Sequence, residues 1–160
     1  MHSIHVKWAQ TLTQDIKRAK TSISITALSM HITKGSATGV YAALFYELET
    51  AIKRGIAVSI YLPAASKIHP AASQNFTTLE HLRKLGALTH QVSLPSLLHA
   101  KTCVIDNRIV FIGSGNWTAA AAGLNREIYA RIIDEKIALE LLSHHSNLLQ
   151  PQEIGSISKW

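Results

Sequence analysis

The chain has 160 residues, of which 47% are hydrophobic and 16% charged, and this is the size and composition of one globular domain. The composition excludes general disorder, and the single cysteine, Cys103, excludes an intrachain disulfide and a multi-cysteine zinc site. The 16 Lys and Arg outnumber the 10 Asp and Glu, so the net charge of +6 favours a polyanionic partner such as nucleic acid or an anionic bilayer.

The first half of the chain alternates between helical and strand patterns. Trp8, Leu12 and Ile16 recur at helical spacing, and the residues after Thr21 alternate between apolar and small polar side chains. Gly55 and Gly86 mark the ends of two later helical patterns. In chain order these patterns predict a helix at 8–19, a strand at 22–28, a helix at 40–55, a strand at 56–62, a helix at 76–86 and a strand at 87–92.

The second half predicts an antiparallel addition to this sheet. Two apolar runs, 100–105 and 109–112, flank a tight turn, and a further strand is expected at 128–132 and a closing helix at 137–148. Helical crossovers imply parallel pairs, whereas a hairpin is antiparallel. The sequence therefore predicts a single-domain α/β fold with a mixed β-sheet flanked by helices, a core at about 9–149 and a loose tail at 150–160.

One stretch combines residue types that suit phosphate chemistry. It contains, at fixed spacing, His99, Lys101, Asp106, Gly113, Ser114 and Asn116. Alternate side chains of a strand share a face, so the imidazole and the ammonium are expected in one pocket. Glycines let backbone approach a ligand, and a hydroxyl and an amide can bond phosphate oxygens. A helix expected from Trp117 through the alanines 119–122 would add the positive field of its N-terminal amides.

This spacing resembles the H-x-K-x4-D-x6-G-S-x-N signature of the phospholipase D superfamily at every fixed position. The resemblance implies a phospholipase D-like sandwich and one nuclease domain at 1–160. It also implies that His99 attacks phosphorus and becomes a phosphohistidine, while Lys101, Ser114 and Asn116 hold the phosphoryl oxygens. Glu127 matches the family's glutamate that hydrogen-bonds the nucleophilic imidazole.

The remaining motif residues are expected to be structural. Asp106 falls at the hairpin turn, and Gly113 and Gly115 flank the serine. Gly115 stands where many family members carry a bulky residue, so the sequence leaves open whether the pocket is wider or its rim looser. His5-Val6-Lys7 also reads H-x-K, but no further motif follows, and we treat it as a decoy.

Several other residues are expected to serve the fold. We expect Trp117 to pack in the core or at its rim and Cys103 to be a small buried hydrophobe. We expect His144 and His145 on a helix surface and not in a metal site.

The superfamily reaction needs a second histidine, yet this chain has one complete motif. It resembles the small single-motif bacterial endonucleases of the superfamily, which pair two identical subunits, so we expect an obligate homodimer. No metal ion or other cofactor is implied, because two Lys101 side chains supply the positive charge.

The charge favours nucleic acid as substrate, either DNA or RNA and either single- or double-stranded, with low sequence specificity and no obligatory membrane contact. Two alternatives stay open. One is a phospholipase D or phosphatidyltransferase acting on phospholipid, for which Leu97, Leu98 and Trp117 could supply an apolar approach. The other is a nucleic-acid-binding module without catalysis.

The sequence does not decide the compartment. No apolar run approaches the roughly 18 residues that span a bilayer. The first residues lack the regions of a secretory signal, although a start placed after a removed signal would look the same. A periplasmic or secreted location is expected if a signal has been removed, and a cytoplasmic one otherwise.

Overall fold

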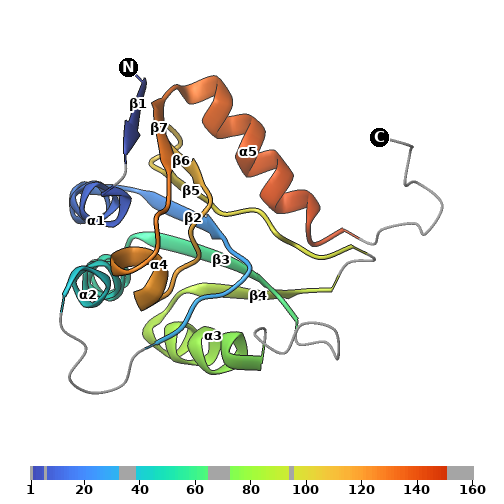
Figure 1. Cartoon of the computed structure of the whole chain (residues 1–160). Helices are drawn as coiled ribbons and strands as arrows, with labels where there is room; N and C mark the ends of the chain where they lie inside the picture. The colour runs from blue at the N-terminus through green and yellow to red at the C-terminus, as the bar shows by residue number, and fades with distance from the viewer. Residues whose placement is uncertain (1, 6, 33–38, 65–72, 94–95, 151–160) are drawn as a thin grey trace.

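The structure is a computed structural model that describes residues 2–5, 7–32, 39–64, 73–93 and 96–150 (Figure 1). The strands are β1 (His2–His5), β2 (Ser22–Thr26), β3 (Ala57–Pro63), β4 (Leu88–Val92), β5 (Thr102–Ile105), β6 (Ile109–Gly113) and β7 (Tyr129–Ile133). The helices are α1 (Trp8–Arg18), α2 (Val40–Lys53), α3 (Ser73–Leu85), α4 (Ala119–Gly123) and α5 (Glu135–Asn147). Beyond residue 150, the predicted loose tail lies outside the described residues.

The strands form one mixed sheet in the order β1-β7-β6-β5-β2-β3-β4. The pairs β2–β3 and β3–β4 are parallel, and the other four pairs are antiparallel. Helices connect the parallel strands, whereas β5 and β6 form the predicted hairpin. The predicted single-domain α/β class with a mixed, helix-flanked sheet is therefore confirmed.

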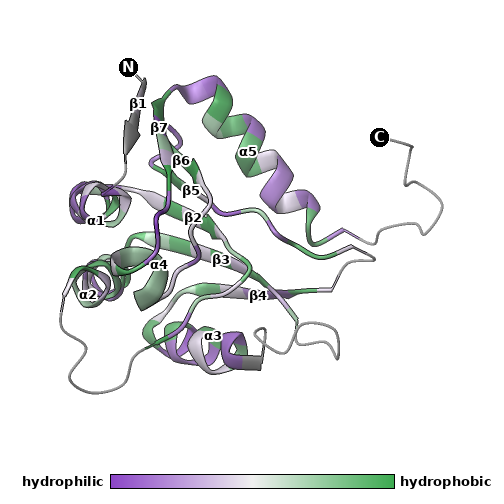
Figure 2. Cartoon of the chain, viewed as in Figure 1, coloured by the Kyte–Doolittle hydropathy of each residue, from purple (hydrophilic) through white to green (hydrophobic). Residues whose placement is uncertain are grey.

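Helices cover the two faces of the sheet unequally. Helices α1 to α4 contribute to the main core on one face, and α5 packs alone on the other, against β2, β5 and β6 (Figure 1). Figure 2 shows hydrophobic residues along the central strands and alternating hydrophobic and hydrophilic residues around α5. Burial of both sheet faces is the main source of stability in such a layered fold.

Strand β2 shows why one histidine of α5 was misplaced by sequence reasoning. Ile23 and Ile25 point into the main core, whereas Ser24 points toward α5. His144 is exposed, but His145 is only 1% exposed, so its predicted place on the helix surface is wrong. The reason is that α5 crosses polar residues of the sheet, and a buried histidine satisfies their hydroxyl groups.

Strand β1 was not predicted. It is four residues long and pairs antiparallel with β7, with His5 opposite Tyr129. So short a segment carries little pattern of its own and depends on pairing with its neighbour. The decoy His5 therefore belongs to a strand at the edge of the sheet.

Candidate active site

Backbone hydrogen bonds bring the motif segments together at one end of the sheet. The amide of Gly113 donates to the carbonyl of Lys101 at 3.1 Å, and the amide of Trp117 donates to that of Ser29 at 3.0 Å. The amide of Ser114 donates to the carbonyl of Ile128 at 3.1 Å, which adds the start of β7. Residues distant in sequence thus share one site because the sheet pairs their strands.

The histidine and the lysine of the motif are in direct contact. Nζ of Lys101 lies 2.9 Å from Nδ1 and 3.1 Å from Nε2 of His99, and it donates to the His99 carbonyl oxygen at 2.7 Å. His99 is exposed, whereas Lys101 is only 7% exposed. We expected His99 and Lys101 to lie on a strand. Strand β5 begins at Thr102, so the pair lies just before the strand. The arrangement presents an imidazole to solvent above a buried ammonium.

Burial and a nearby carboxylate act on this lysine in opposite directions. Burial lowers the pKa of the Lys101 ammonium below its usual value, while the charge of Glu127 raises it. Such a group is still a strong hydrogen-bond donor, and its charge is only weakly screened where water is excluded. It can therefore stabilise an anion placed beside His99.

Glu127 has partners other than the predicted one. Its carboxylate accepts from Oγ of Ser114 at 2.5 Å and from Nδ2 of Asn125 at 3.0 Å. The expected Glu127–His99 bond is not formed within the single chain, because the β6–β7 register sets Glu127 beside Ser114. The Ser114 hydroxyl also accepts from the amide of Ile128 at 3.2 Å, so a phosphate oxygen would have to compete for it.

The two glycines of the motif are required by what lies against them. A Cβ at Gly113 would come within 2.4 Å of the Tyr129 ring. A Cβ at Gly115 would lie 3.1 Å from Cγ of Glu127. Gly115 therefore does not leave an empty pocket, because Glu127 packs against its backbone. The small residue fixes where that carboxylate can sit.

Asn116 is anchored to the segment after β2. Its Oδ1 accepts from the amide of Ser29 at 3.4 Å. This bond orients the side-chain amide, whose NH2 group can still donate to a ligand. Trp117 is 1% exposed and belongs to the main core, as predicted, and Cys103 is buried as a small hydrophobe.

Helix α3 supplies supporting residues that sequence reasoning missed. Asn75 is fully buried, accepts from the amide of Met30 at 3.1 Å and donates to the carbonyl of Leu28 at 3.0 Å. Thr78 donates to the carbonyl of Met30 at 2.7 Å. They hold the segment that carries Ser29. Polar residues on an amphipathic helix resemble solvent-facing ones, so no sequence pattern indicates this role.

Asp106 lies at the opposite end of β5 from the histidine. Its carboxylate accepts from the backbone amides of Lys20, Thr21 and Ser22 at 2.8 to 3.1 Å. Asp106 and Asn107 both have positive φ, which fits a tight hairpin. We propose that Asp106 serves the fold by fixing the α1–β2 connection to the hairpin.

The helix after the motif does not have the predicted extent. Helix α4 has five residues and begins at Ala119, and Oγ1 of Thr118 accepts from the amide of Ala121 at 3.2 Å. The cap uses an amide that we had expected to face an anion. So short a helix adds little field, and the charge at the site comes from Lys101.

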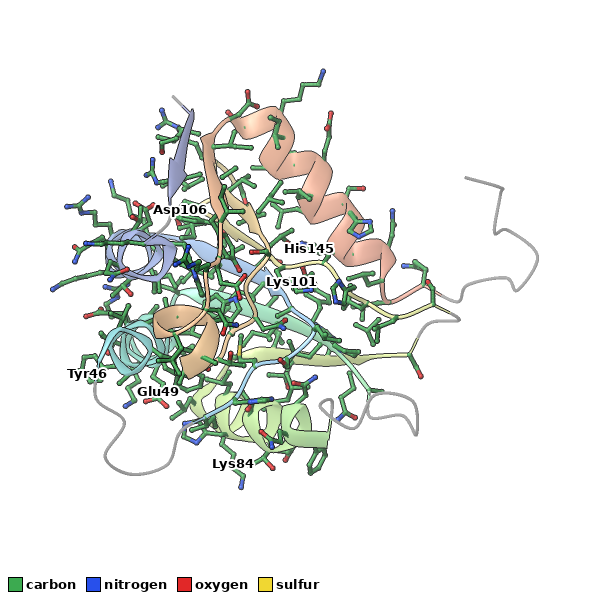
Figure 3. All side chains as sticks on the ribbon, in the orientation of Figure 1. Tyr46, Glu49, Lys84, Lys101, Asp106 and His145 are labelled. Carbon is green, nitrogen blue, oxygen red and sulfur yellow. The ribbon has the colours of Figure 1, made fainter. Side chains whose placement is uncertain are left out.

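Figure 3 labels Lys101 near the middle of the molecule and Asp106 beside the hairpin.

Among the described residues, no three His, Cys, Asp or Glu side chains are grouped so that they could hold a metal ion. Within the same residues, no helix is long and apolar enough to cross a membrane.

The fold and the site define a phospholipase D-like α/β protein. The sequence matches the family described as "Cardiolipin synthase, PLD-like domain" over residues 12–149. The chain therefore belongs to this family of the phospholipase D superfamily, whose members are phosphodiesterases and transferases.

The chain is similar to three known proteins, one by sequence and two by structure. The chain is 33% identical over 115 residues to cardiolipin synthase A of Buchnera aphidicola subsp. Schizaphis graminum (strain Sg), covering 71% of this chain and 22% of the synthase. The structure is similar to the phospholipase D family member Nuc of Salmonella typhimurium, with a TM-score of 0.74, 24% identity and coverage of 92% of this chain and 93% of Nuc. It is equally similar to NucT of Helicobacter pylori, with a TM-score of 0.74, 22% identity and coverage of 93% and 95%.

Proposed function

We propose that the chain is a metal-independent endonuclease that hydrolyses DNA or RNA through a phosphohistidine at His99, in a homodimeric active site. The observation that carries the proposal is the exposed imidazole of His99 in contact with the buried ammonium of Lys101. This pair provides a nucleophile and an anion-binding group without a metal ion.

The chemistry follows from these groups in two steps. A ring nitrogen of His99 attacks phosphorus and forms an N–P bond, while the bond from phosphorus to the leaving oxygen breaks. The partner subunit's His99 gives a proton to that oxygen and then takes one from water. The water oxygen attacks phosphorus, the N–P bond breaks, and His99 is regenerated. Lys101 and the Asn116 amide hold the phosphoryl oxygens throughout.

The surface around His99 supports docking of a second copy. Large apolar side chains are exposed at this end of the sheet: Leu97 is 36% exposed, Ile112 38% and Ile128 55%. Ile112 pairs with Thr102, directly after Lys101, and Ile128 follows Glu127. A two-fold contact over these residues would cover apolar surface and bring two imidazoles together.

Three observations favour nucleic acid over phospholipid. The net charge of +6 suits a polyanion, and the chain spans only about a fifth of the cardiolipin synthase to which it is similar. Of the three residues that the sequence suggested for an approach to acyl chains, Leu98 is only 5% exposed and Trp117 only 1%, so of these three only Leu97 is accessible. The identity to the lipid synthase keeps phospholipid as the second candidate substrate.

The first test compares substrates in the presence of EDTA. We expect the wild-type protein to cleave plasmid DNA and oligonucleotides but not labelled phosphatidylcholine. His99→Ala should lose at least about 10⁴-fold in rate, whereas the exposed His144→Ala should keep full activity. Trapping without acid should yield a phosphorylated histidine in wild type only. Cleavage that vanishes with EDTA, or DNA binding without cleavage, would contradict the proposal.

A mixing experiment tests the shared site. Wild type and His99→Ala are mixed in equal amounts and allowed to exchange subunits. If each site needs both copies of His99, only wild-type pairs are active, and activity falls to about a quarter of that of the same total amount of wild type. A fall to about half would show that each chain works alone.

A further inference from the structure

Five exposed cations gather at the end of the sheet opposite the candidate active site. We call this surface the basic end, and it consists of Lys17, Arg18, Lys20, Lys53 and Arg54. The residues come from the last turns of α1 and α2 and from the segments that follow them. They are nearly a third of the 16 Lys and Arg of the whole chain, so they account for much of its positive charge.

Hydrogen bonds hold these segments side by side. The guanidinium of Arg54 donates to the carbonyl of Lys17 at 2.7 Å and to that of Ile16 at 3.2 Å. The amide of Ala57 donates to the carbonyl of Thr21 at 3.0 Å, which joins the starts of β3 and β2. The basic end is therefore one surface and not a set of scattered charges.

The positive charge of the basic end is not neutralised within the described part of the chain. The ion pairs found there are His81–Glu49, Arg83–Glu80 and Arg131–Asp15, and none of them includes a member of the basic end. The nearby Asp106 carboxylate is occupied by three backbone amides and by the hydroxyl of Thr21. Five like charges close together repel one another, so an anionic partner would be favoured there.

Position separates the basic end from the catalytic pocket. The backbone amide of Lys20 donates to the carboxylate of Asp106, which lies five residues beyond Lys101 at the other end of β5, or about 16 Å away at about 3.3 Å per residue. In Figure 3, nitrogen-tipped side chains extend outward from α1, away from the labelled Lys101. The five cations of the basic end therefore do not line the site where phosphate would be cleaved.

Helix-end electrostatics explains only part of this cluster. Lys and Arg are favoured in the last turn of a helix because they face its negative end, which accounts for Lys17, Arg18 and Lys53. Lys20 lies beyond the end of α1, and the Arg54 guanidinium already satisfies carbonyl groups of that helix. Lys20 and Arg54 therefore add positive charge that helix ends do not explain, and a surface that binds a polyanion requires such charge.

We propose that the basic end is a second contact for the phosphate backbone of nucleic acid, separate from the cleavage site. Its role as a substrate contact rests on the proposed nuclease function, whereas its binding of nucleic acid does not. A nucleic acid fits better than a bilayer, because the basic end contains no large exposed apolar side chain to insert between lipids. In the proposed homodimer, the two basic ends would also point away from each other, so one flat membrane could not reach both.

Binding is tested in the His99→Ala protein, which should not cut the probe. The double variant K20Q/K53Q removes two charges from the basic end, and K7Q/K136Q removes two exposed lysines from other surfaces. A labelled DNA duplex of about 30 base pairs is titrated by fluorescence anisotropy between about 50 and 200 mM salt. K20Q/K53Q should lower the slope of log Kobs against log salt by about 1.8, and K7Q/K136Q should leave it unchanged.

Two further arms make the result decisive. In the wild-type background, K20Q/K53Q should hydrolyse a small phosphodiester at the wild-type rate but show a raised KM on DNA. Equal slopes for the two double variants would overturn the second contact while leaving the nuclease proposal intact. Vesicles of phosphatidylcholine with anionic phosphatidylglycerol form the last arm. If K20Q/K53Q loses vesicle binding but keeps its DNA slope, the surface is a membrane contact and the proposal is wrong.

Discussion

His145 makes the stability of this fold depend on pH. Its Nδ1 lies 2.8 Å from Oγ of Ser24, and its Nε2 lies 2.8 Å from Oγ1 of Thr102. Oγ1 of Thr102 lies in turn 2.8 Å from Oγ1 of Thr26. These polar groups are buried between α5 and the sheet, and one of them, Thr102, directly follows Lys101 in the chain. Burial, with a smaller effect from the neighbouring His144, lowers the pKa of His145 from 6.5 to about 4.

The sign and size of the effect follow from this shift. Between about pH 6.5 and pH 4, the unfolded chain binds a proton at His145 that the folded chain does not, so acidification favours unfolding. The difference of about 2.5 between the two pKa values corresponds to about 3 kcal/mol of folding stability. This stability is lost as the pH falls from about 6.5 to about 4, and the loss does not increase at lower pH. The free energy of unfolding, measured by urea denaturation at fixed protein concentration, should fall by at least this amount.

Matched variants isolate the histidine from other titrating groups. His145→Gln keeps hydrogen-bonding groups but cannot titrate, so its free energy of unfolding should fall with acid by about 3 kcal/mol less than that of wild type. His144→Gln, at the exposed neighbour, should follow the wild-type curve. If His145→Gln shows the wild-type pH dependence, the buried network does not hold a neutral imidazole and the reasoning fails.

Two further variants test residues that shape the site and the turn. Gly113→Ala would place a Cβ 2.4 Å from the Tyr129 ring and should lower the free energy of unfolding by about 3 kcal/mol. The control is Gly123→Ala, whose Cβ has nothing within 4 Å. In urea denaturation, this control should change the free energy of unfolding by less than about 0.5 kcal/mol. Asp106→Asn should cost about 2 kcal/mol at neutral pH, because an amide cannot accept all the bonds from the α1–β2 connection. Burial raises the pKa of the Asp106 carboxyl, but hydrogen bonds from backbone amides 20–22 outweigh it and lower the pKa below 3.8. The stability that Asp106 adds over Asn should therefore disappear as the pH falls below about 3.8. A difference between wild type and Asp106→Asn that does not depend on pH would contradict this reasoning.

The fold was predictable where each element carries its own pattern. The helix at Val40 and the strand before Pro63 show regular apolar spacing, and the Asp106-Asn107 turn is a strong hairpin signal. Strand β1 has no such pattern, because its order comes from pairing with β7. His145 was misplaced for a related reason: what a helix histidine faces depends on which strands the helix crosses.

The sequence predicted that the motif residues meet at one end of the sheet, but it did not predict how they pair. The spacing of His99 and Lys101 correctly brought the two side chains together. It could not show that Glu127 binds Ser114, because the partner of a carboxylate depends on strand register and on the packing of Gly115. Asn75 was not predicted at all, since a supporting residue on a helix has no spacing relation to the motif that it supports.

The site lies where the sheet changes from parallel to antiparallel pairing of its strands. Strand β2 has a parallel neighbour, β3, on one side and an antiparallel neighbour, β5, on the other. In other α/β sheets, ligand sites lie beyond the carboxyl ends of the strands at such switch points, and here Lys101 lies beyond the carboxyl end of β2, next to Thr102, which pairs with Thr26. The parallel half supplies a braced segment at Ser29, and the antiparallel half supplies His99, Lys101 and Asn116. Only one such point occurs in the described sheet, and we therefore propose that the second histidine of the reaction comes from a second copy of the chain.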